Sequence, residues 1–399
     1  MLLADITVVE YAQFVAGPFC GKILAGLGAE VIKVEPPAGD IARRRGPFLD
    51  RRPGLETSAL FLYLNTGKKG VTLNTELPSG RELLLRLLGL ADVLIVDLAT
   101  PDLARLGLDY PSLREQFPQL VVVSITPFGS EGPRSGWKAY ELNLFHGGGE
   151  GYLLPNGLAY ELAPERGPLK AGGYLAHYEV GVAGAVAVLV ALYVREFTGR
   201  GQYVDVSAQE VQLNLNITAV NRYLNGTLET RANRSFRYGG VLPCRDGYVE
   251  LLALEQHQWD ALVELIGNPD WARDERFKDP ISRSRYGADI NARLREWSRN
   301  YSKEELYRLA QEKGIPVGPY YDAAEVVNSE HERRRGFFAP VEHPFTGPVL
   351  YPTWPFRFSG EPPPAPGRAP LLGEHNGEIF GRLGVLPEEI ARLAANGVV

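Results

Sequence analysis

Cysteine is almost absent from this 399-residue chain, which has only Cys20 and Cys244. Two cysteines cannot build a disulfide framework, and such low usage is typical of a reducing compartment, so we expect a cytoplasmic protein. The six histidines form no HExxH pair, and no closely spaced Cys/His set is present. The sequence therefore predicts no metal site.

Motifs that would indicate several common enzyme classes are also missing. No GxGxxG or GxxxxGK[ST] loop follows an early strand, which argues against a dinucleotide-dependent dehydrogenase and a P-loop enzyme. No GxSxG turn is present, which argues against the usual serine hydrolases. The net charge of -6 argues against a general nucleic-acid-binding protein.

No segment is expected to enter a membrane. The stretch MLLADITVVEYAQ has Asp5 and Glu10 where a signal peptide would have a basic start and a long apolar run. The longest apolar run, Val180 to Val194, is shorter than the roughly 18 to 20 residues that a membrane span needs. We therefore expect this run to form a buried helix.

The first 130 residues alternate between strand and helix patterns. Strand–helix–strand units at this spacing indicate a parallel sheet covered by helices, in which ligands bind beyond the carboxyl ends of the strands. Ser79 is predicted to cap the helix SGRELLLRLLGLA. The predicted strands are ITVVEY, AEVIKVEPP, DVLIVDL and LVVVSITPFG.

The pattern changes near Gly226, where a smaller α+β domain is predicted. Within it, the helix SKEELYRLAQEKG begins with a capping box, because Ser302 is followed three residues later by Glu305.

His177 stands where a long helix of small residues, VGVAGAVAVLVAL, is about to begin. Gly172 and Gly173 precede it and allow the backbone to approach a ligand closely. A helix N-terminus favours negative charge, so a carboxylate nucleophile would suit this position and a histidine would tend to be neutral. From the residues alone, a structural and a catalytic histidine both remain open.

Two basic stretches are candidate sites for an anionic ligand. NTGKKGVTLN places Asn65, Lys68 and Lys69 on a turn before a strand, and DIARRRGPF places three arginines, Arg43 to Arg45, in one exposed loop. Phosphates favour such places because cations and free N–H groups screen their charge. A solvated basic surface is the other interpretation.

Seven stretches, in order along nearly the whole chain, match one family: VVEYAQFVAGPFCGKILAGLGAEVIKVEPPAGD, NTGKKGVTLN, ADVLIVDLATPDLARLGLDYPSL, SITPFGSEGP, REFTGRGQYVDVS, GIPVGPYYDAAEVVNSEHERRRGFFAPVEHP and RAPLLGEHNGEIFGRLG. With them the chain resembles the class III coenzyme A transferases, the CaiB/BaiF group that includes formyl-CoA transferase and α-methylacyl-CoA racemase. The resemblance implies an α/β fold, with a Rossmann-like large domain from both chain ends, a smaller α+β domain and an interlocked dimer. The ranges expected are 1–205 (large CoA-binding domain, first part), 206–225 (linker), 226–325 (small domain), 326–350 (linker) and 351–399 (return to the large domain).

The resemblance also implies the ligands and partners. Coenzyme A enters as an acyl-CoA substrate, a carboxylic acid is the second substrate, and no cofactor is permanently bound. The chain is expected as a homodimer, or as a heterodimer with an aspartate-bearing homologue, without nucleic acid or membrane. The implied CoA site consists of Gln13, Phe14, Val15, Ala16, Arg43, Leu64, Asn65, Lys68, Lys69, Asp97, Leu98, Arg105, Leu106, Lys138 and Tyr140.

Position 177 departs from the family pattern. Where G-x-x-x-A-D-x-x-x-G has the aspartate that attacks the thioester, this chain reads GGYLAHYEVG, with His177. Three interpretations stay open: Glu179 replaces the nucleophile, His177 and a Glu141 of raised pKa act as α-proton bases in a racemase, or the chain is a non-nucleophilic subunit. Phe145 and His146 also depart from the family and are expected to reshape the acyl pocket.

Overall fold

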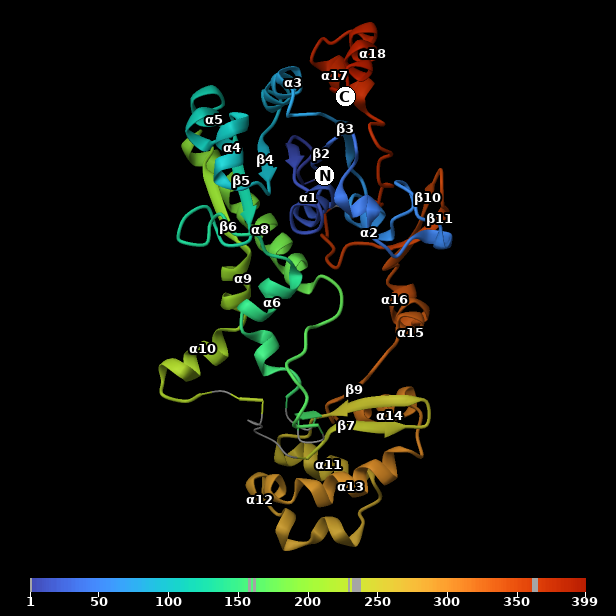
Figure 1. The fold of residues 1–399 in the computed structure, drawn as a ribbon. Helices are drawn as coiled ribbons and strands as arrows, with labels where there is room; N and C mark the ends of the chain where they lie inside the picture. The colour runs from blue at the N-terminus through green and yellow to red at the C-terminus, as the bar shows by residue number, and fades with distance from the viewer. Residues whose placement is uncertain (1, 157–158, 161–162, 229, 232–237, 361–364) are drawn as a thin grey trace. The chain divides into compact units, whose positions relative to one another are not determined.

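A computed structural model describes residues 2–156, 159–160, 163–228, 230–231, 238–360 and 365–399. It divides the chain into two compact units (Figure 1). Unit 1 consists of Met1–Glu150, Lys170–Ile217 and His331–Val399, and unit 2 consists of Gly151–Leu169 and Thr218–Glu330.

The boundaries of the two units can be compared with the predicted domain and linker ranges. The predicted linkers 206–225 and 326–350 each contain one point where the chain passes between the units, after Ile217 and after Glu330. Residues 151–169 had been expected in the large domain but group with unit 2. Unit 1 does combine both ends of the chain.

Unit 1 is organised around a six-stranded sheet in which every neighbouring pair is parallel, with the order β3-β2-β1-β4-β5-β6. The predicted α/β fold is thereby confirmed, and the strand order reverses between β1 and β4, where such sheets bind ligands. The strands are β1 (Thr7–Tyr11), β2 (Glu30–Glu35), β3 (Lys69–Thr72), β4 (Val93–Val96), β5 (Val121–Thr126) and β6 (Tyr203–Ser207).

Helices cover both faces of this sheet, as buried Val- and Ile-rich parallel strands require. One face packs on α3 (Pro78–Leu88), α4 (Thr100–Leu106), α5 (Tyr110–Gln116), α17 (Asn376–Arg382) and α18 (Pro387–Ala395) through a single apolar cluster. The opposite side carries α1 (Ala16–Gly26) and α8 (Leu175–Thr198). Unit 1 also contains α2 (Ala59–Leu64), α6 (Glu141–Gly147) and α9 (Ala208–Leu215).

Helix α8 contains the long apolar run, and only one of its faces is buried. Small residues allow it to lie against α1: a Cβ on Gly181 would come within 2.8 Å of the Ala16 carbonyl oxygen. Its other face exposes Val186, Val190 and Tyr193. Among the described residues, α8 is the one helix whose length and composition would suffice to span a membrane. The prediction of a buried helix is therefore right for one face only.

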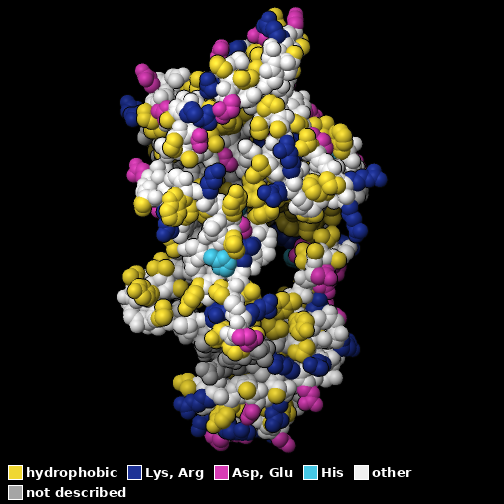
Figure 2. Space-filling model, in the orientation of Figure 1, with side chains coloured by type: hydrophobic (Ala, Val, Ile, Leu, Met, Phe, Trp, Pro, Cys, Tyr) yellow, Lys and Arg dark blue, Asp and Glu magenta, His cyan; other side chains and the backbone are white. Residues whose placement is uncertain are grey.

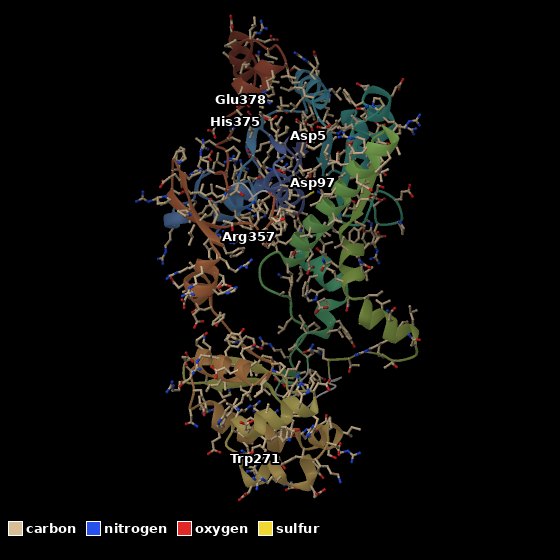
Figure 3. All side chains as sticks on the ribbon, turned by 180° about the vertical axis from the view of Figure 1, so that it is seen from behind. Asp5, Asp97, Trp271, Arg357, His375 and Glu378 are labelled. Carbon is tan, nitrogen blue, oxygen red and sulfur yellow. The ribbon has the colours of Figure 1, made fainter. Side chains whose placement is uncertain are left out.

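The C-terminal stretch closes the β3 edge of the sheet. After the antiparallel hairpin of β10 (Phe338–His343) and β11 (Gly347–Pro352), the chain reaches β3. The Gly70 N–H donates to His375 Nδ1 at 3.1 Å, and Lys69 pairs with Glu378 at 2.6 Å (Figure 3). These contacts explain how distant ends of the chain form one unit.

Unit 2 has its own three-stranded antiparallel sheet, in the order β7-β8-β9, and its own core around Trp259, Leu262 and Leu294. Trp271, labelled in Figure 3, packs against this core. Unit 2 contains α10 (Ile217–Leu224), β7 (Gly240–Cys244), β8 (Gly247–Leu251), α11 (Gln256–Leu265), α12 (Pro280–Arg285), α13 (Gly287–Ser298), α14 (Lys303–Glu312), β9 (Val317–Pro319) and α15 (Ala323–Asn328). The next helix, α16 (Glu330–Arg334), begins at the last residue of unit 2 and continues in unit 1.

The two predicted helix caps have opposite outcomes. The capping box of α14 is confirmed, because the Ser302 hydroxyl accepts from the Glu305 N–H at 3.2 Å and the Glu305 carboxylate accepts from the Ser302 N–H at 3.2 Å. The Ser79 cap is wrong, because α3 begins at Pro78 with Leu77 as its N-cap, so Ser79 is already the second residue of the helix. Proline has the backbone angle of a first helical residue and no N–H to satisfy there.

Charged side chains of both signs are intermingled on the face shown in Figure 2, without one broad basic patch. No group of three or more potential metal ligands occurs within the part of the chain that the structure describes.

Candidate active site

A cavity of about 210 Å³ lies at the carboxyl ends of β4 and β5. The loop between β1 and α1 lines it, together with Tyr140, His177 and Ala208 at the starts of α6, α8 and α9. This is the edge of a parallel sheet at which ligands bind. The other lining residues are Gln13, Phe14, Ala16, Gly17, Ile41, Asp97, Ile125, Thr126, Pro127, Ala139 and Leu144.

Two carboxylates hold the loop that follows β1. The Gln13 N–H donates to Asp97 Oδ2 at 2.8 Å, and the Phe14 N–H donates to Asp40 Oδ1 at 3.0 Å. Phe14 has a φ of 69°, a left-handed backbone that strains a residue with a side chain. The family resemblance implies that Gln13 and Phe14 contact CoA, but the backbone N–H groups of both are already bound within unit 1.

His177 is held by Glu141, the first residue of α6. Its Nδ1 lies 2.8 Å from Glu141 Oε2, and its backbone N–H donates to the same oxygen at 3.2 Å. The Ala176 N–H donates to Glu141 Oε1 at 3.0 Å. Since Tyr174 gives α8 no side-chain cap, Glu141 satisfies two of the N–H groups that open that helix.

These bonds set the charge of Glu141 and the position of the proton that it shares with His177. Burial would raise the pKa of Glu141, but the hydrogen bonds from His177 and Ala176 outweigh it and hold the pKa below its usual range. The predicted raised pKa of Glu141 is therefore wrong. An ionised Glu141 can only accept a hydrogen bond, so the proton of this bond lies on His177 Nδ1, and the imidazole also lines the cavity.

Aromatic rings pack around His177 edge to face. The ring of Phe14 lies 5.4 Å from that of His177 at 88°, and the ring of Tyr174 lies 6.3 Å away at 86°. Together with Glu141 they restrict the orientation of the imidazole, as a reacting group requires.

Asp97 is a second ionisable group in the cavity, at the end of β4 (Figure 3). Burial raises the pKa of Asp97 to about 7, although the Gln13 N–H donates to its carboxylate. The carboxyl group of Asp97 therefore exchanges a proton near neutral pH in the cavity that His177 also lines.

Glu179 does not share the cavity with His177. Both residues belong to α8, where two positions along the helix point roughly 200° apart. Glu179 Oε2 instead accepts from Gln212 Nε2 at 2.7 Å. The residue is absent from the lining of the cavity.

The predicted site residues fall into three groups. Gln13, Phe14, Ala16, Asp97, Tyr140 and His177 line the cavity, with Glu141 behind His177. Val15, Leu64, Asn65 and Leu106 are buried in the interior, and Leu98 packs against it. Phe145 is also buried, and His146 lies beside it. The predicted cations form the third group.

Arg43 is fully buried, so the prediction of three exposed arginines is wrong for this one. It forms a bidentate pair with Glu35 at 2.7 and 2.8 Å and a further pair with Glu56 at 2.8 Å. Its guanidinium lies 3.6 Å from the centre of the Phe61 ring. With its donors used within unit 1, Arg43 stabilises the loop rather than offering a charge to a ligand.

Lys68 is likewise buried. Its Nζ lies 2.7 Å from Glu10 Oε2 and 2.9 Å from Asn65 Oδ1. The other oxygen of Glu10 pairs with Lys33 at 3.1 Å, and Lys33 pairs with Asp40 at 2.7 Å. Through Asp40 this network supports the Phe14 loop, so Lys68 acts behind the cavity and does not line it.

Three predicted cations are exposed enough to contact a phosphate. Lys138 is exposed next to the cavity residues Ala139 and Tyr140, and no ion pair of it is found among the described residues. Arg105 is exposed but pairs with Glu76 at 2.7 Å. Lys69 is partly exposed at the far edge of the sheet.

Sequence reasoning missed Glu10, Lys33 and Asp40 as parts of the site. A signal existed, since Glu10 in VVEY and Lys33 in VIKVE interrupt apolar strands. A charge in such a strand is either at an edge or paired inside. Asp40 precedes a short 3-10 helix and caps it by accepting from the Ala42 N–H at 2.7 Å.

Comparisons with known proteins identify this architecture. Residues 3–376 match the model of CoA-transferase family III. The chain is 32% identical over 419 residues to a formyl-CoA:oxalate CoA-transferase of Streptomyces avermitilis, covering 100% of this chain and 99% of that protein. It is 33% identical over 396 residues to the succinyl-CoA:(R)-benzylsuccinate CoA-transferase subunit BbsE of Thauera aromatica, covering 96% and 95%.

A solved structure supports the same family assignment. The crystal structure of a CaiB/BaiF family protein from Brucella suis superposes with a TM-score of 0.84 at 31% identity, covering 95% of this chain and 98% of that chain. The family model, the relatives and this structure all extend over nearly the full length, so both units are included. The chain belongs to CoA-transferase family III.

Proposed function

We propose that this chain takes part in moving CoA between an acyl-CoA thioester and a carboxylic acid, as the non-nucleophilic subunit of a hetero-oligomer. Its partner would be a homologue that carries an aspartate at the position of His177. The chain would bind CoA and position the thioester, and the partner would supply the attacking carboxylate.

One observation carries the proposal: the position expected to attack the thioester is a histidine whose Nδ1 is bound to Glu141 at 2.8 Å. Neither nearby glutamate replaces the missing nucleophile. Glu141 already accepts three hydrogen bonds, two of them from backbone N–H groups. Glu179 lies outside the cavity and accepts from Gln212. Asp97 is in the cavity, but it anchors the Gln13 N–H.

The size of the cavity fits the reacting end of the ligand. A volume of about 210 Å³ is below that of a pocket for a whole drug-sized ligand, so an acyl group and its thioester would fill it. The nucleotide would extend over the surface, where Lys138 is the exposed cation next to the lining residues. Coenzyme A would thus bind and dissociate as a substrate and would not be a permanently bound cofactor.

A partner chain is supported by the exposed face of α8. Val190, Tyr193 and Phe197 are 56%, 67% and 74% exposed. Monomeric proteins rarely leave such a continuous apolar face uncovered. The relative BbsE is described as a subunit. We propose that this face packs against a second chain in an interlocked dimer, and that the complex works in the cytoplasm, since Cys20 and Cys244 are both free thiols.

The racemase alternative fits the geometry less well. A racemase needs two bases on opposite sides of the α-carbon, whereas His177 and Glu141 are hydrogen-bonded to each other. The ionised Glu141 is buried behind the histidine. Absence of deuterium incorporation at the α-carbon of branched acyl-CoA substrates would exclude this alternative.

The proposal is tested by isolating the chain from its source with an affinity tag and identifying what co-purifies. We expect an aspartate-bearing homologue of the same family in stoichiometric amount. CoA should bind to the purified chain in calorimetry, but transfer of CoA from succinyl-CoA to a carboxylic acid should require the partner. Turnover by the isolated chain, with an acyl adduct on one of its own residues, would contradict the subunit role.

Restoring the carboxylate gives a second test. His177→Asp alone would place two carboxylates side by side, so it is combined with Glu141→Gln to avoid their repulsion. We expect the double variant to gain transfer activity without the partner. The matched control is His177→Asn with Glu141→Gln, which has the same shape but no nucleophile and should remain inactive.

A further inference from the structure

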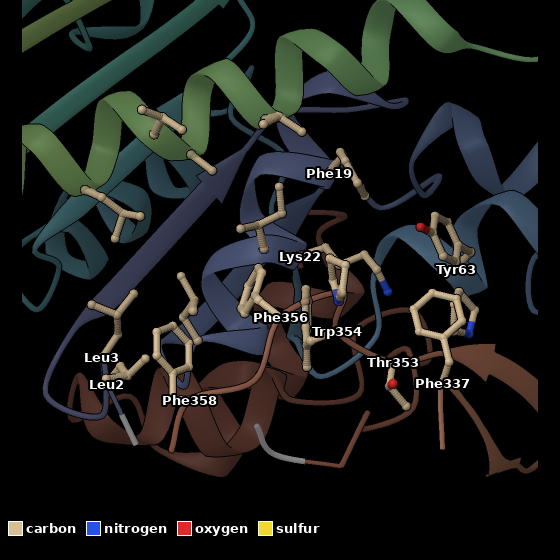
Figure 4. A pocket seen from close by; sticks show the side chains of 18 residues that line it. Leu2, Leu3, Phe19, Lys22, Tyr63, Phe337, Thr353, Trp354, Phe356 and Phe358 are labelled. Carbon is tan, nitrogen blue, oxygen red and sulfur yellow. The ribbon is translucent and has the colours of Figure 1, made fainter. Parts of the chain in front are cut away.

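A second and larger cavity of about 590 Å³ lies in unit 1, among α1, α2, α8 and the segment that follows β11 (Figure 4). Its walls are almost entirely apolar, with Ile23 from α1, Val186 and Leu189 from α8, and Phe356 and Phe358 from the C-terminal segment. It shares no lining residue with the cavity at His177. Its size and composition are those of a pocket for a small apolar ligand.

One cation stands in this apolar cavity. Lys22 is only 5% exposed, and none of the described carboxylates pairs with it. Its Nζ donates to the Thr66 hydroxyl at 2.5 Å and lies 4.3 Å from the centre of the Tyr63 ring and 5.7 Å from that of Trp354. A buried ammonium without a carboxylate is costly, which leaves a place for an anion.

A second donor is unsatisfied at the same place. The indole N–H of Trp354 is buried, and none of the residues that the structure describes accepts from it. Its ring packs directly on α1, where a Cβ at Gly26 would come within 1.5 Å of it, so the indole has little freedom to turn toward another acceptor. Figure 4 shows Lys22 and Trp354 close together in the pocket. Buried donors without partners are rare and call for an acceptor.

We propose that this pocket binds an apolar carboxylic acid, whose carboxylate pairs with Lys22 and accepts from the Trp354 indole while its tail lies on α8 and the phenylalanines. Charge complementarity selects this class of ligand, because the pocket offers one cation, one N–H donor and an otherwise apolar surface. The inference goes beyond the proposed function, since this site is separate from the cavity at His177.

The charge of Lys22 should link ligand binding to pH. Burial lowers the pKa of Lys22 to about 7, with the neighbouring Lys68 adding to the effect. The other titratable group that faces it is Tyr63, whose pKa is raised by burial, while α8 and the segment after β11 add only uncharged side chains. A bound carboxylate favours the protonated amine, so binding at pH 8 should take up a proton.

The test compares octanoate with octanamide, which has the same tail without the charge, by titration calorimetry on the full-length protein at pH 6 and pH 8. We expect octanoate to bind at least about tenfold more tightly than octanamide at pH 6. Titrations in buffers of different ionisation enthalpy should show proton uptake at pH 8. The Lys22→Met variant should lose both the preference and the proton uptake, and Trp354→Phe should lose part of the preference.

The matched control is Lys278→Met, an exposed lysine of unit 2, which should bind octanoate as the wild type does. Equal affinity for octanoate and octanamide, or an unchanged preference in Lys22→Met, would overturn the proposal. Failure of both ligands to bind because a second chain fills the pocket would overturn it as well. CoA binding and partner-dependent transfer do not involve Lys22, so these outcomes are distinguishable from failure of the proposed function.

Discussion

Unit 1 has two regions in which paired ionisable side chains cluster. They differ in whether one of the paired side chains also faces a cavity in which a ligand could bind. In the network beneath β1, β2 and β3, Arg43 and Lys68 are enclosed with their carboxylate partners. At the start of α8, His177 and Glu141 form an equally short pair, but the imidazole also lines a cavity. A saturated, buried pair stabilises the fold, whereas a pair with one open atom can act on a ligand.

The largest effect on stability is expected from a substitution in the buried ion-pair network. Arg43→Met would leave Glu35 buried without its partner, so we expect the free energy of unfolding to fall by about 3–5 kcal/mol in urea titrations. The control is the exposed neighbour, Arg44→Met, which should change it by less than about 0.5 kcal/mol. A loss of CoA affinity with unchanged stability would instead restore Arg43 to the role of a phosphate ligand.

A smaller effect is expected from the open region. Glu141→Gln should lower the free energy of unfolding by about 1–3 kcal/mol near pH 7, because three hydrogen bonds lose their charged acceptor. A lowered native pKa stabilises the fold above the unfolded value of about 4.3, and that stability is lost as pH falls through the native pKa. The variant should therefore lose less stability on acidification.

Urea unfolding between pH 3 and pH 7 measures that difference, with the exposed Glu82→Gln as control. If the wild type and Glu141→Gln lose stability in parallel as the pH falls, Glu141 is not the ionised cap of α8.

The difference between the two regions also explains what the sequence could predict. Alternating strands and helices and the capping box at Ser302 are local patterns, and they predicted the sheet and α14 correctly. The partner of Arg43 depends on how β2 lies against the loop that follows it, so a basic run looked like an exposed loop. The nearness of Glu141 and His177 was predicted only through the family resemblance, and their direct bond could not be read from 36 residues of separation.

The start of α3 could not be predicted from Ser79 for a similar reason, because the first residue of a helix depends on the conformation of the preceding turn.

Nor could the sequence alone show that Glu179 and His177 have different surroundings. They are two positions apart in the sequence, but only the helical backbone of α8 decides that they face different neighbours.

A modest effect on CoA affinity is expected from Lys138, the exposed lysine next to the cavity that His177 lines. Lys138→Met should weaken CoA binding by about two- to fivefold, because an exposed cation contributes little to a phosphate contact. The affinity should also depend less steeply on salt concentration, while thermal stability stays unchanged. Calorimetry at two salt concentrations measures both, with Lys278→Met in unit 2 as control. Unchanged affinity would remove Lys138 from the CoA site.

The smallest effect is expected from Glu179→Gln. If the cavity defines the reacting groups, Glu179 is a bystander that accepts from Gln212, and a glutamine preserves the shape of that contact. Transfer by the reconstituted complex should then stay within about twofold of the wild type, which is below 0.5 kcal/mol in the barrier. A loss of several orders of magnitude, with an acyl adduct trapped by hydroxylamine in the wild type only, would mean that α8 rearranges to bring Glu179 to the thioester. Glu179 would then be the nucleophile, and the chain would need no partner to supply one.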